Sequence, residues 1–269
     1  MSGYTRRSAL AMTVAVWLLA SACAAIPGVS SPMSTSSPGS AAVPSAPPSA
    51  SAGATPHPMP TADGAVGLEA GTYAFDFTRL DAPGKPFPRV LITVPGGWSG
   101  FRGFGVDSLS GSRSHFVGFW NVVDVYTNSC QWIGPKVQTG STVDELAAVL
   151  AARPLRHATV PVSVSLGGYA GKYLEWSVPK DIAFSSCDKD PSDGHFYFDS
   201  WTGNALWNAP YDSSGTTDRY QQSPGQVDRL WILDVEGRRL VIDASYLPGA
   251  TAQDRADLQQ VVDSIRFEP

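Results

Sequence analysis

The feature that most limits the fold of this chain is a long segment near its start without a single Asp, Glu, Lys or Arg. It runs from Ala24 to Ala62 and is dominated by Ser, Ala, Pro, Gly and Thr. Such a segment has too little large apolar surface to offset the entropy lost when a chain is ordered. We therefore predict that residues 23–65 form a disordered, semi-flexible tether and that residues 66–269 form one globular domain.

Residues 1–22 have the pattern of a secretory signal peptide. Arg6 and Arg7 provide the positive start, and the apolar run Ala9–Ala20 is too short for an ordinary membrane span. Small residues then precede Cys23. Paired arginines occur in general secretory signals and in twin-arginine signals, so the sequence leaves the export route open.

The residues that end the signal resemble a bacterial lipoprotein signal, although Ala20 stands where that family prefers Leu. The resemblance implies that processing exposes Cys23 as the new N-terminus and that lipid is attached there, with palmitate as an expected modification. The domain is then held at the outer face of the cell membrane by its lipid anchor, with the tether as a spacer. The alternative is ordinary cleavage near residues 22–25, which would give a secreted protein.

The charge balance limits the class of partner. Removing Arg6 and Arg7 with the signal leaves 17 of the 19 basic residues against 24 acidic residues, a formal charge of −7. Nucleic acids and anionic membrane surfaces attract clustered Lys and Arg side chains. We therefore expect no nucleic acid among the partners, and membrane attachment through the lipid anchor.

Beyond Gly67 the hydrophobic pattern predicts strands. Short runs of alternating or continuous apolar residues are separated by Gly and Pro, which is typical of strands joined by turns. We expect strands at Thr72–Phe77, Arg89–Val94, Phe116–Tyr126, Val160–Leu166, Tyr173–Val178, His195–Trp201, Arg229–Val235 and Arg239–Asp243. The short connection Glu236-Gly237-Arg238 between the last two runs indicates a β-hairpin.

Two helices are also predicted. Thr142 is expected to cap the helix Val143–Arg153, with Glu145 completing a capping box. A second helix is expected to start at Thr251, because the apolar residues that follow recur at helical spacing. There is no regular βαβ alternation, so the predicted fold class is α+β, a mainly antiparallel sheet packed with two helices.

Four of these features together resemble the PsbP-like fold. They are the strand that ends in Val94-Pro95-Gly96-Gly97-Trp98, the mid-chain helix, the late hairpin, and the closing helix that runs into Ser264-Ile265-Arg266-Phe267. The resemblance covers about Gly71–Phe267. It implies a layered domain, with an antiparallel sheet between helices, that serves as an accessory or binding module. The family supplies no shared catalytic residues.

The domain contains two cysteines, Cys130 and Cys187. Outside the cytoplasm an unpaired thiol is a liability, so we predict a disulfide between them. Two free buried thiols or a redox pair are the alternatives, but the Cys-x-x-Cys spacing of a redox pair is absent. The acidic run Asp188–Gly194 partly matches a calcium-binding loop, but Asp193 stands where the loop needs glycine. We interpret it as a solvated turn and predict no metal site and no cofactor.

No catalytic motif is complete in this sequence. His115, His157 and His195 are far apart and have no metal-ligand spacing. Ser165 lacks the first glycine of a Gly-x-Ser-x-Gly elbow, because Ser163 stands at that position. We therefore assign no catalytic residues. A cell-envelope hydrolase with a Ser/His/Asp site assembled in space from distant residues remains the alternative.

The tryptophans are the remaining candidates for ligand contact. Trp201 and Trp207 flank a run that contains Gly and Asn, which makes these two the candidates for exposed, ligand-facing aromatic residues. Packing in the core is the competing interpretation for both.

We therefore predict an exported, membrane-anchored lipoprotein, not an enzyme, whose extracytoplasmic domain binds or interacts with a protein, a glycan or an apolar ligand. A structural stalk or sensor domain is a further alternative. The sequence indicates neither the ligand nor the oligomeric state.

Overall fold

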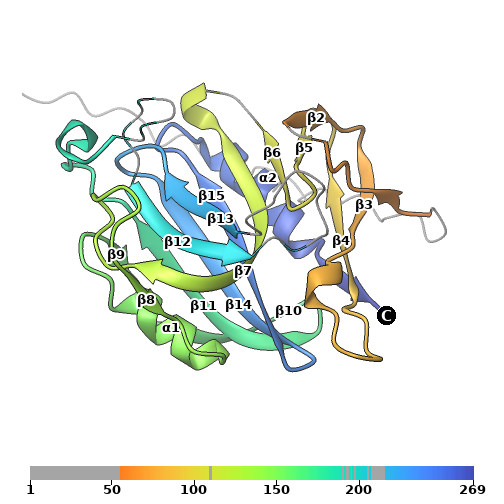
Figure 1. Cartoon of the computed structure of the whole chain (residues 1–269). Helices are drawn as coiled ribbons and strands as arrows, with labels where there is room; N and C mark the ends of the chain where they lie inside the picture. Colours follow the sequence, from red (N-terminus) through yellow and green to blue (C-terminus); the bar gives the residue numbers. More distant parts are fainter. Residues whose placement is uncertain are drawn as a thin grey trace, which may run out of the picture. The chain divides into compact units, whose positions relative to one another are not determined.

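The computed structural model describes residues 55–62, 64–108, 111–189, 191, 194, 196, 198–204, 206 and 216–269 (Figure 1). The predicted signal peptide, Cys23 and most of the predicted tether lie outside these residues. Within them the chain forms two sheets, in which all strand pairs but one are antiparallel, and two α-helices. The predicted α+β class with a mainly antiparallel sheet is confirmed.

The larger sheet follows the order β10-β11-β14-β15-β7-β6-β5-β2. Its strands are β10 (Val162–Leu166), β11 (Tyr169–Ser177), β14 (Val227–Val235), β15 (Arg238–Tyr246), β7 (His115–Tyr126), β6 (Gly105–Ser108), β5 (Ser99–Phe101) and β2 (Ala65–Gly67). The short strand β9 (His157–Ala158) pairs with the end of β11. Neighbours in sequence are therefore often neighbours in the sheet, as expected for strands joined by short turns.

Strand β7 connects this sheet to a second layer. Its first half, up to Trp120, pairs with β15, and its second half pairs with β12 (Phe198–Asn204) and with β8 (Lys136–Gln138). Strand β12 in turn pairs with β13 (Thr216–Gln221). Side chains of β13 bond to β14 and β15, so the β12–β13 pair packs over one face of the larger sheet (Figure 1).

The smaller sheet has the order β1-β3-β4-β16. Its strands are β1 (His57–Pro58), β3 (Gly71–Phe75), β4 (Arg89–Val94) and β16 (Arg266–Glu268). β1 and β3 are parallel. Here the predicted tether boundary is wrong, because Met59 is only 6% exposed and its amide donates to the carbonyl of Ala74. The ordered domain therefore begins before residue 66, with one apolar side chain anchoring the first short strand.

Both predicted helices are present with their predicted caps. Helix α1 (Val143–Ala151) begins after Thr142, which forms a capping box with Glu145. Helix α2 (Ala252–Asp263) begins after Thr251 in the same manner. Reciprocal side-chain bonds satisfy amides that the first turn of a helix leaves unpaired. Helix α1 packs against β11 and β14, whereas α2 packs against β4, β7 and β15. The described residues also form three short 3-10 helices: η1 (Thr78–Leu80), η2 (Gly111–Arg113) and η3 (Phe184–Ser186).

The predicted hairpin is formed by β14 and β15. Its connection is the two-residue turn Glu236-Gly237, with φ values of 55° and 81°. Positive φ at both central residues matches the twist of the flanking strands, and glycine adopts it without steric cost. Because the turn closes so tightly, the next two residues, Arg238 and Arg239, are already in the strand and project to opposite faces.

The larger sheet separates two hydrophobic cores. One lies between this sheet, α2 and the smaller sheet, and contains Ile242 of β15 and Phe119 of β7. The other lies under α1 and the β12–β13 pair, and contains Val241 and Trp120. Successive residues of one strand enter different cores because side chains alternate across a strand.

Cys130 and Cys187 form a disulfide, with a Cα–Cα distance of 4.6 Å. Around it the backbone is also bonded, since the amide of Asp188 donates to the carbonyl of Cys130 at 3.0 Å. Phe184 and Phe198 stack beside it with ring centroids 5.5 Å apart. The disulfide links the loop after β7 to the segment that precedes β12, 57 residues further along the chain.

Several strand limits differ from the predictions. β11 begins at Tyr169 rather than Tyr173, and β12 continues to Asn204 rather than ending at Trp201. His195, the predicted first residue of that strand, lies outside the described residues. β13 was not predicted, because Thr216–Gln221 is polar and shows no apolar run. Arg219 and Gln221 bond to buried carboxylates of the larger sheet, so apolar periodicity gives no signal for this strand.

Candidate functional site

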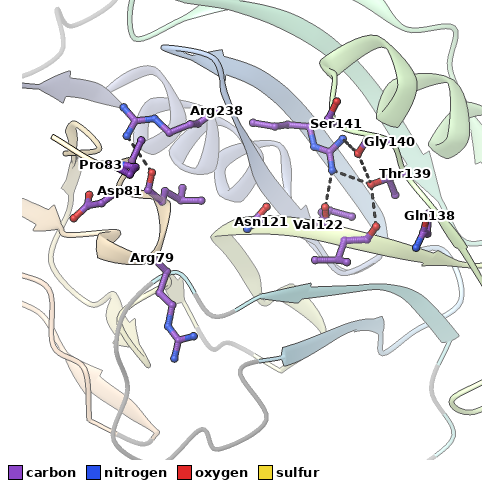
Figure 2. A pocket seen from close by; sticks show the side chains of 14 residues that line it. Arg79, Asp81, Pro83, Asn121, Val122, Gln138, Thr139, Gly140, Ser141 and Arg238 are labelled. Carbon is purple, nitrogen blue, oxygen red and sulfur yellow. Dashed lines mark hydrogen bonds between the residues drawn. The ribbon is translucent and has the colours of Figure 1, made fainter. Parts of the chain in front are cut away.

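An open cleft of about 700 Å³ lies beside the start of β15 (Figure 2). One wall is the segment 79–83 around η1, and the other is the segment 138–141 that leads into α1. Residues 121–123 of β7 line it between these walls, and Arg238 and Arg239 belong to its lining. The volume is within the range of small-molecule sites, roughly 300–1,000 Å³.

Arg238 fixes the first wall. Its guanidinium donates to the carbonyls of Leu80, Lys85 and Pro86 at 3.0, 3.0 and 3.2 Å. It also packs on the ring of Phe87, with 4.9 Å from Cζ to the ring centroid. These contacts tie the loop after η1 to the start of β15.

Arg239 fixes the second wall. It donates to the carbonyls of Val122, Gly140 and Thr142 at 2.6, 3.0 and 3.1 Å, and to Thr139 Oγ1 at 2.8 Å. The strand alternation that separates Arg238 from Arg239 therefore builds both sides of one cleft. In Figure 2 the guanidinium of Arg238 lies on the side of Asp81 and Pro83, in the first wall.

The electrostatics of the second wall favour a fixed loop. Glu145 accepts bonds from the amides of Ser141 and Thr142 at 3.0 and 2.9 Å. The Thr142 amide and hydroxyl, followed by the Ser141 amide, hold the pKa of this carboxyl below its ordinary value. Burial lowers the pKa of Arg239, and Glu145 acts in the opposite direction. No contact between the Arg239 guanidinium and a carboxylate occurs in the described part of the chain.

Four polar side chains of the lining make no side-chain hydrogen bond or ion pair within the described residues: Arg79, Asn121, Gln138 and Ser141. Arg79 is exposed, and its backbone amide donates to the carbonyl of Leu206 at 3.1 Å. The carboxylate of Asp81 accepts a hydrogen bond from the amide of Phe87 at 2.8 Å, and this bond closes the loop after η1. The available polar groups of the described lining are therefore one guanidinium, two carboxamides and one hydroxyl.

A second group of charged residues is buried under the β12–β13 pair. Arg219 donates to Asp243 Oδ2 at 2.6 Å and to Asp228 Oδ1 at 3.0 Å. Gln221 also bonds to Asp228, and Gln226 donates to Asp228 Oδ1 at 2.8 Å. Asp228 and Asp243 are 1% and 0% exposed. Burial raises the pKa of Asp243 to about 7, against the opposing effect of Arg219. The cluster fastens β13 to the larger sheet.

Arg156 extends this polar interior. It lies between the rings of Trp176 and Phe198, at 4.4 and 4.6 Å from their centroids. Its Nη2 donates to the carbonyl of Asp199 at 2.6 Å and to Ser200 Oγ at 3.2 Å. Burial lowers its pKa to about 9. We interpret Arg156 as a structural cation held by two aromatic faces and carbonyl acceptors.

The expected exposure of Trp201 is wrong. Trp201 is 0% exposed and packs against Trp120 and Trp176, with ring centroids 5.9 and 5.8 Å apart. Because β12 pairs with the second half of β7, its tryptophan turns into the core under α1. Trp207, the other predicted ligand-facing residue, lies outside the described residues.

The described histidines are not brought together with a serine and an aspartate in any hydrogen-bonded set. His115 is 6% exposed, contacts the carbonyl of Arg113 at 3.2 Å and packs edge-on against Trp98. His157 is exposed in β9. His195 lies outside the described residues. Over the same part of the chain, no group of three or more His, Cys, Asp or Glu side chains is suited to a metal ion.

Comparison with known proteins gives no family for this chain. No family model, curated protein or solved structure matches it. Among the described helices, none has the length and apolar character required to cross a membrane.

Sequence reasoning missed the cleft. Its key residues, Arg238 and Arg239, follow the turn of a hairpin that was predicted, and adjacent arginines at a strand start are an available signal. Their partners are backbone carbonyls up to 158 residues away in sequence. A carbonyl is present at every residue, so the sequence does not mark which ones an arginine will bind.

Proposed function

We propose that this protein is an exported, membrane-anchored lipoprotein whose extracytoplasmic domain binds its ligand in the cleft beside β15. The signal pattern and Cys23 support export and anchoring, and the uncharged segment that follows supports a spacer role. The cleft supports binding rather than catalysis. We place the ligand site there because it is a concavity with fixed walls and free polar groups.

The single observation that carries this proposal is that the described lining offers polar groups for binding but no side chain that is free for acid–base catalysis. Among the described residues that line the cleft there is no histidine and no cysteine. The one carboxylate of the lining, Asp81, bonds to a backbone amide of its own loop. General acid–base catalysis requires a positioned proton donor or acceptor with access to the reacting group. The cleft instead has rigid walls and available amides, which suit recognition.

We also propose that the domain has a PsbP-like layer arrangement. Two features support it: α1 packs on one face of the larger sheet, and α2 packs on the other. A sheet covered by a helix on each face agrees with an accessory or binding module. An experimental structure of the domain would test the layering directly.

The binding site is tested with a matched pair of valine substitutions. Val123 is 38% exposed and lines the cleft, whereas Val162 is 53% exposed on β10, outside it. V123W should fill the cleft without opening the core, because tryptophan is well accepted in strands. We would measure ligand-observed NMR signals of glycan and peptide fractions of a bacterial cell envelope with the purified full chain.

The expected result is that compounds bound by the wild-type chain are released from V123W and retained by V162W. Equal binding by both variants would place the ligand elsewhere, and absence of binding by the wild-type chain would contradict a binding function for the cleft.

Anchoring is tested separately. Expression in a bacterial host fed labelled palmitate should label the wild-type chain, and C23S should lose both the label and the membrane fraction. Label on C23S, or an unlabelled wild-type chain, would contradict the proposed anchor.

A further inference from the structure

The cleft has the opposite charge balance to the whole chain. Its charged lining residues are Arg79, Arg238, Arg239 and Asp81, so three cations face one carboxylate. The complete chain has a formal net charge of −5. Cations gathered in a concavity with low-dielectric walls produce a local positive potential, which concentrates anions.

No contact of the Arg239 guanidinium within the described residues neutralises its charge, whereas Arg238 and Lys85 share the single carboxylate of Glu236. Arg239 bonds to three carbonyls and one hydroxyl, all of them neutral acceptors. Arg238 bonds to three carbonyls and to Glu236 at 3.2 Å, and that carboxylate also pairs with Lys85 at 3.2 Å. Neutral acceptors orient a guanidinium but leave its net charge in place. Burial removes part of the water around the Arg239 guanidinium. Charges attract more strongly where less water screens them, so this guanidinium would stabilise an anion in the cleft.

One cation of the cleft is free to bind a ligand directly. Arg79 is exposed and makes no side-chain bond within the described residues, and the amides of Asn121 and Gln138 are similarly available. A guanidinium offers a planar pair of N–H donors that match the two oxygens of a carboxylate or phosphate. Carboxamides add donors and acceptors for the neutral part of the same ligand.

We propose that the cleft binds a small polar ligand that carries a carboxylate or phosphate group, with Arg79 as the direct contact and Arg238 and Arg239 as the source of the positive field. This inference rests on the proposed function, since it names the ligand class of the same cleft. Asn121 and Gln138 line the same cleft, and their carboxamides supply donors and acceptors for hydroxyl or amide groups of the ligand.

The test is an NMR titration of the isotope-labelled full chain with citrate, inorganic phosphate and maltotriose, which represent a carboxylate, a phosphate and a neutral polar ligand. The reporters are the backbone amides of residues 79–82, 121–123 and 138–141. Each probe is titrated into the wild-type chain, R79Q, R79K and R266Q. Arg266 is an exposed arginine of β16 outside the lining, so R266Q changes the net charge equally and serves as the matched control.

We expect citrate or phosphate to shift the cleft amides, with weaker binding at higher salt concentration. R79Q should weaken this binding about tenfold or more, as for a lost charged hydrogen bond, whereas R79K retains part of it and R266Q retains it fully. Shifts with citrate alone identify a carboxylate ligand, and shifts with phosphate alone identify a phosphorylated one.

The proposal is overturned if neither anion shifts the cleft amides, or if R79Q and R266Q weaken anion binding equally. Binding of maltotriose alone at the cleft amides would also overturn it, while leaving the proposed binding function intact. Failure of the proposed function itself is seen in the V123W experiment, which does not depend on the charge of the ligand.

Discussion

The two faces of the larger sheet are built on different principles. The face toward α2 and the smaller sheet is mainly apolar, with Phe119, Leu240 and Ile242 among its fully or almost fully buried residues. The face toward the β12–β13 pair contains buried charges, with Arg219 between Asp228 and Asp243. Adjacent residues of β15, Ile242 and Asp243, thus experience opposite environments across one backbone.

The difference indicates how each cover layer is held. Burial of apolar area is non-directional, so α2 and the smaller sheet are held by many weak contacts that tolerate conservative changes. A buried ion pair with hydrogen bonds is directional and is costly to break on one side only. The polar β13, which has few apolar residues to bury, therefore depends on Arg219 for its position.

The largest effect is expected for R219A. It leaves Asp228 and Asp243 buried without their cation, and should lower the free energy of unfolding by about 3–5 kcal/mol. Urea denaturation at neutral pH measures the change. R266A, at an exposed arginine, is the control and should change stability by less than about 0.5 kcal/mol. If both variants were equally stable, Arg219 would not be what holds β13.

A smaller effect is expected for I242V on the apolar face. Removing one buried methylene should cost about 0.5–1.5 kcal/mol, with an unchanged dependence on urea concentration. The reason is that neighbouring side chains of the same core relax partly into the space. If I242V lowered the free energy of unfolding as much as R219A, packing on the apolar face would tolerate substitution no better than the charged face does.

The smallest effect at acidic pH is expected for D243N, because the Asp243 carboxyl is already protonated there. Its pKa is raised from 3.8 to about 7 by burial, so the folded state holds a proton that the unfolded state has lost. The stability contributed by this proton is present below pH 3.8 and is lost as the pH rises through about 7. D243N should therefore become more stable relative to the wild-type chain over that range.

Unfolding measured in urea at a series of pH values tests this difference. Asp107, whose pKa burial raises to about 6, titrates in the same direction in both proteins, so it cancels in the comparison. Parallel stability curves for the wild-type chain and D243N would show that Asp243 does not titrate in this range.

Much of the secondary structure followed from local patterns. Both helices begin at the predicted threonine caps, and the strand Arg89–Val94 has the predicted limits. The predicted hairpin connection Glu236-Gly237-Arg238 contains the turn at Glu236-Gly237, although Arg238 already belongs to β15. These features depend on residues within a few positions of one another. Little of the candidate site followed, because its walls come from segments that are distant in sequence.

The burial of Trp201 is the clearest example of a feature that could not be predicted from neighbouring residues. Its neighbours in sequence are polar or small, which suggested exposure, but pairing of β12 with β7 turns its ring against Trp120 and Trp176. Burial of a side chain is decided by what covers its face of the sheet. The rings that cover Trp201 belong to Trp120 and Trp176, which lie in other strands earlier in the chain.

The sequence by itself determined where the helices start, where the hairpin turns and which two cysteines were available to pair, because caps, turns and parity are local or countable. The tertiary structure alone decided the burial of Trp201, the charged interior around Arg219 and the cleft built by Arg238 and Arg239. The physical reason is that these arginines bind backbone carbonyls and distant carboxylates, and only the folded chain brings those acceptors to them.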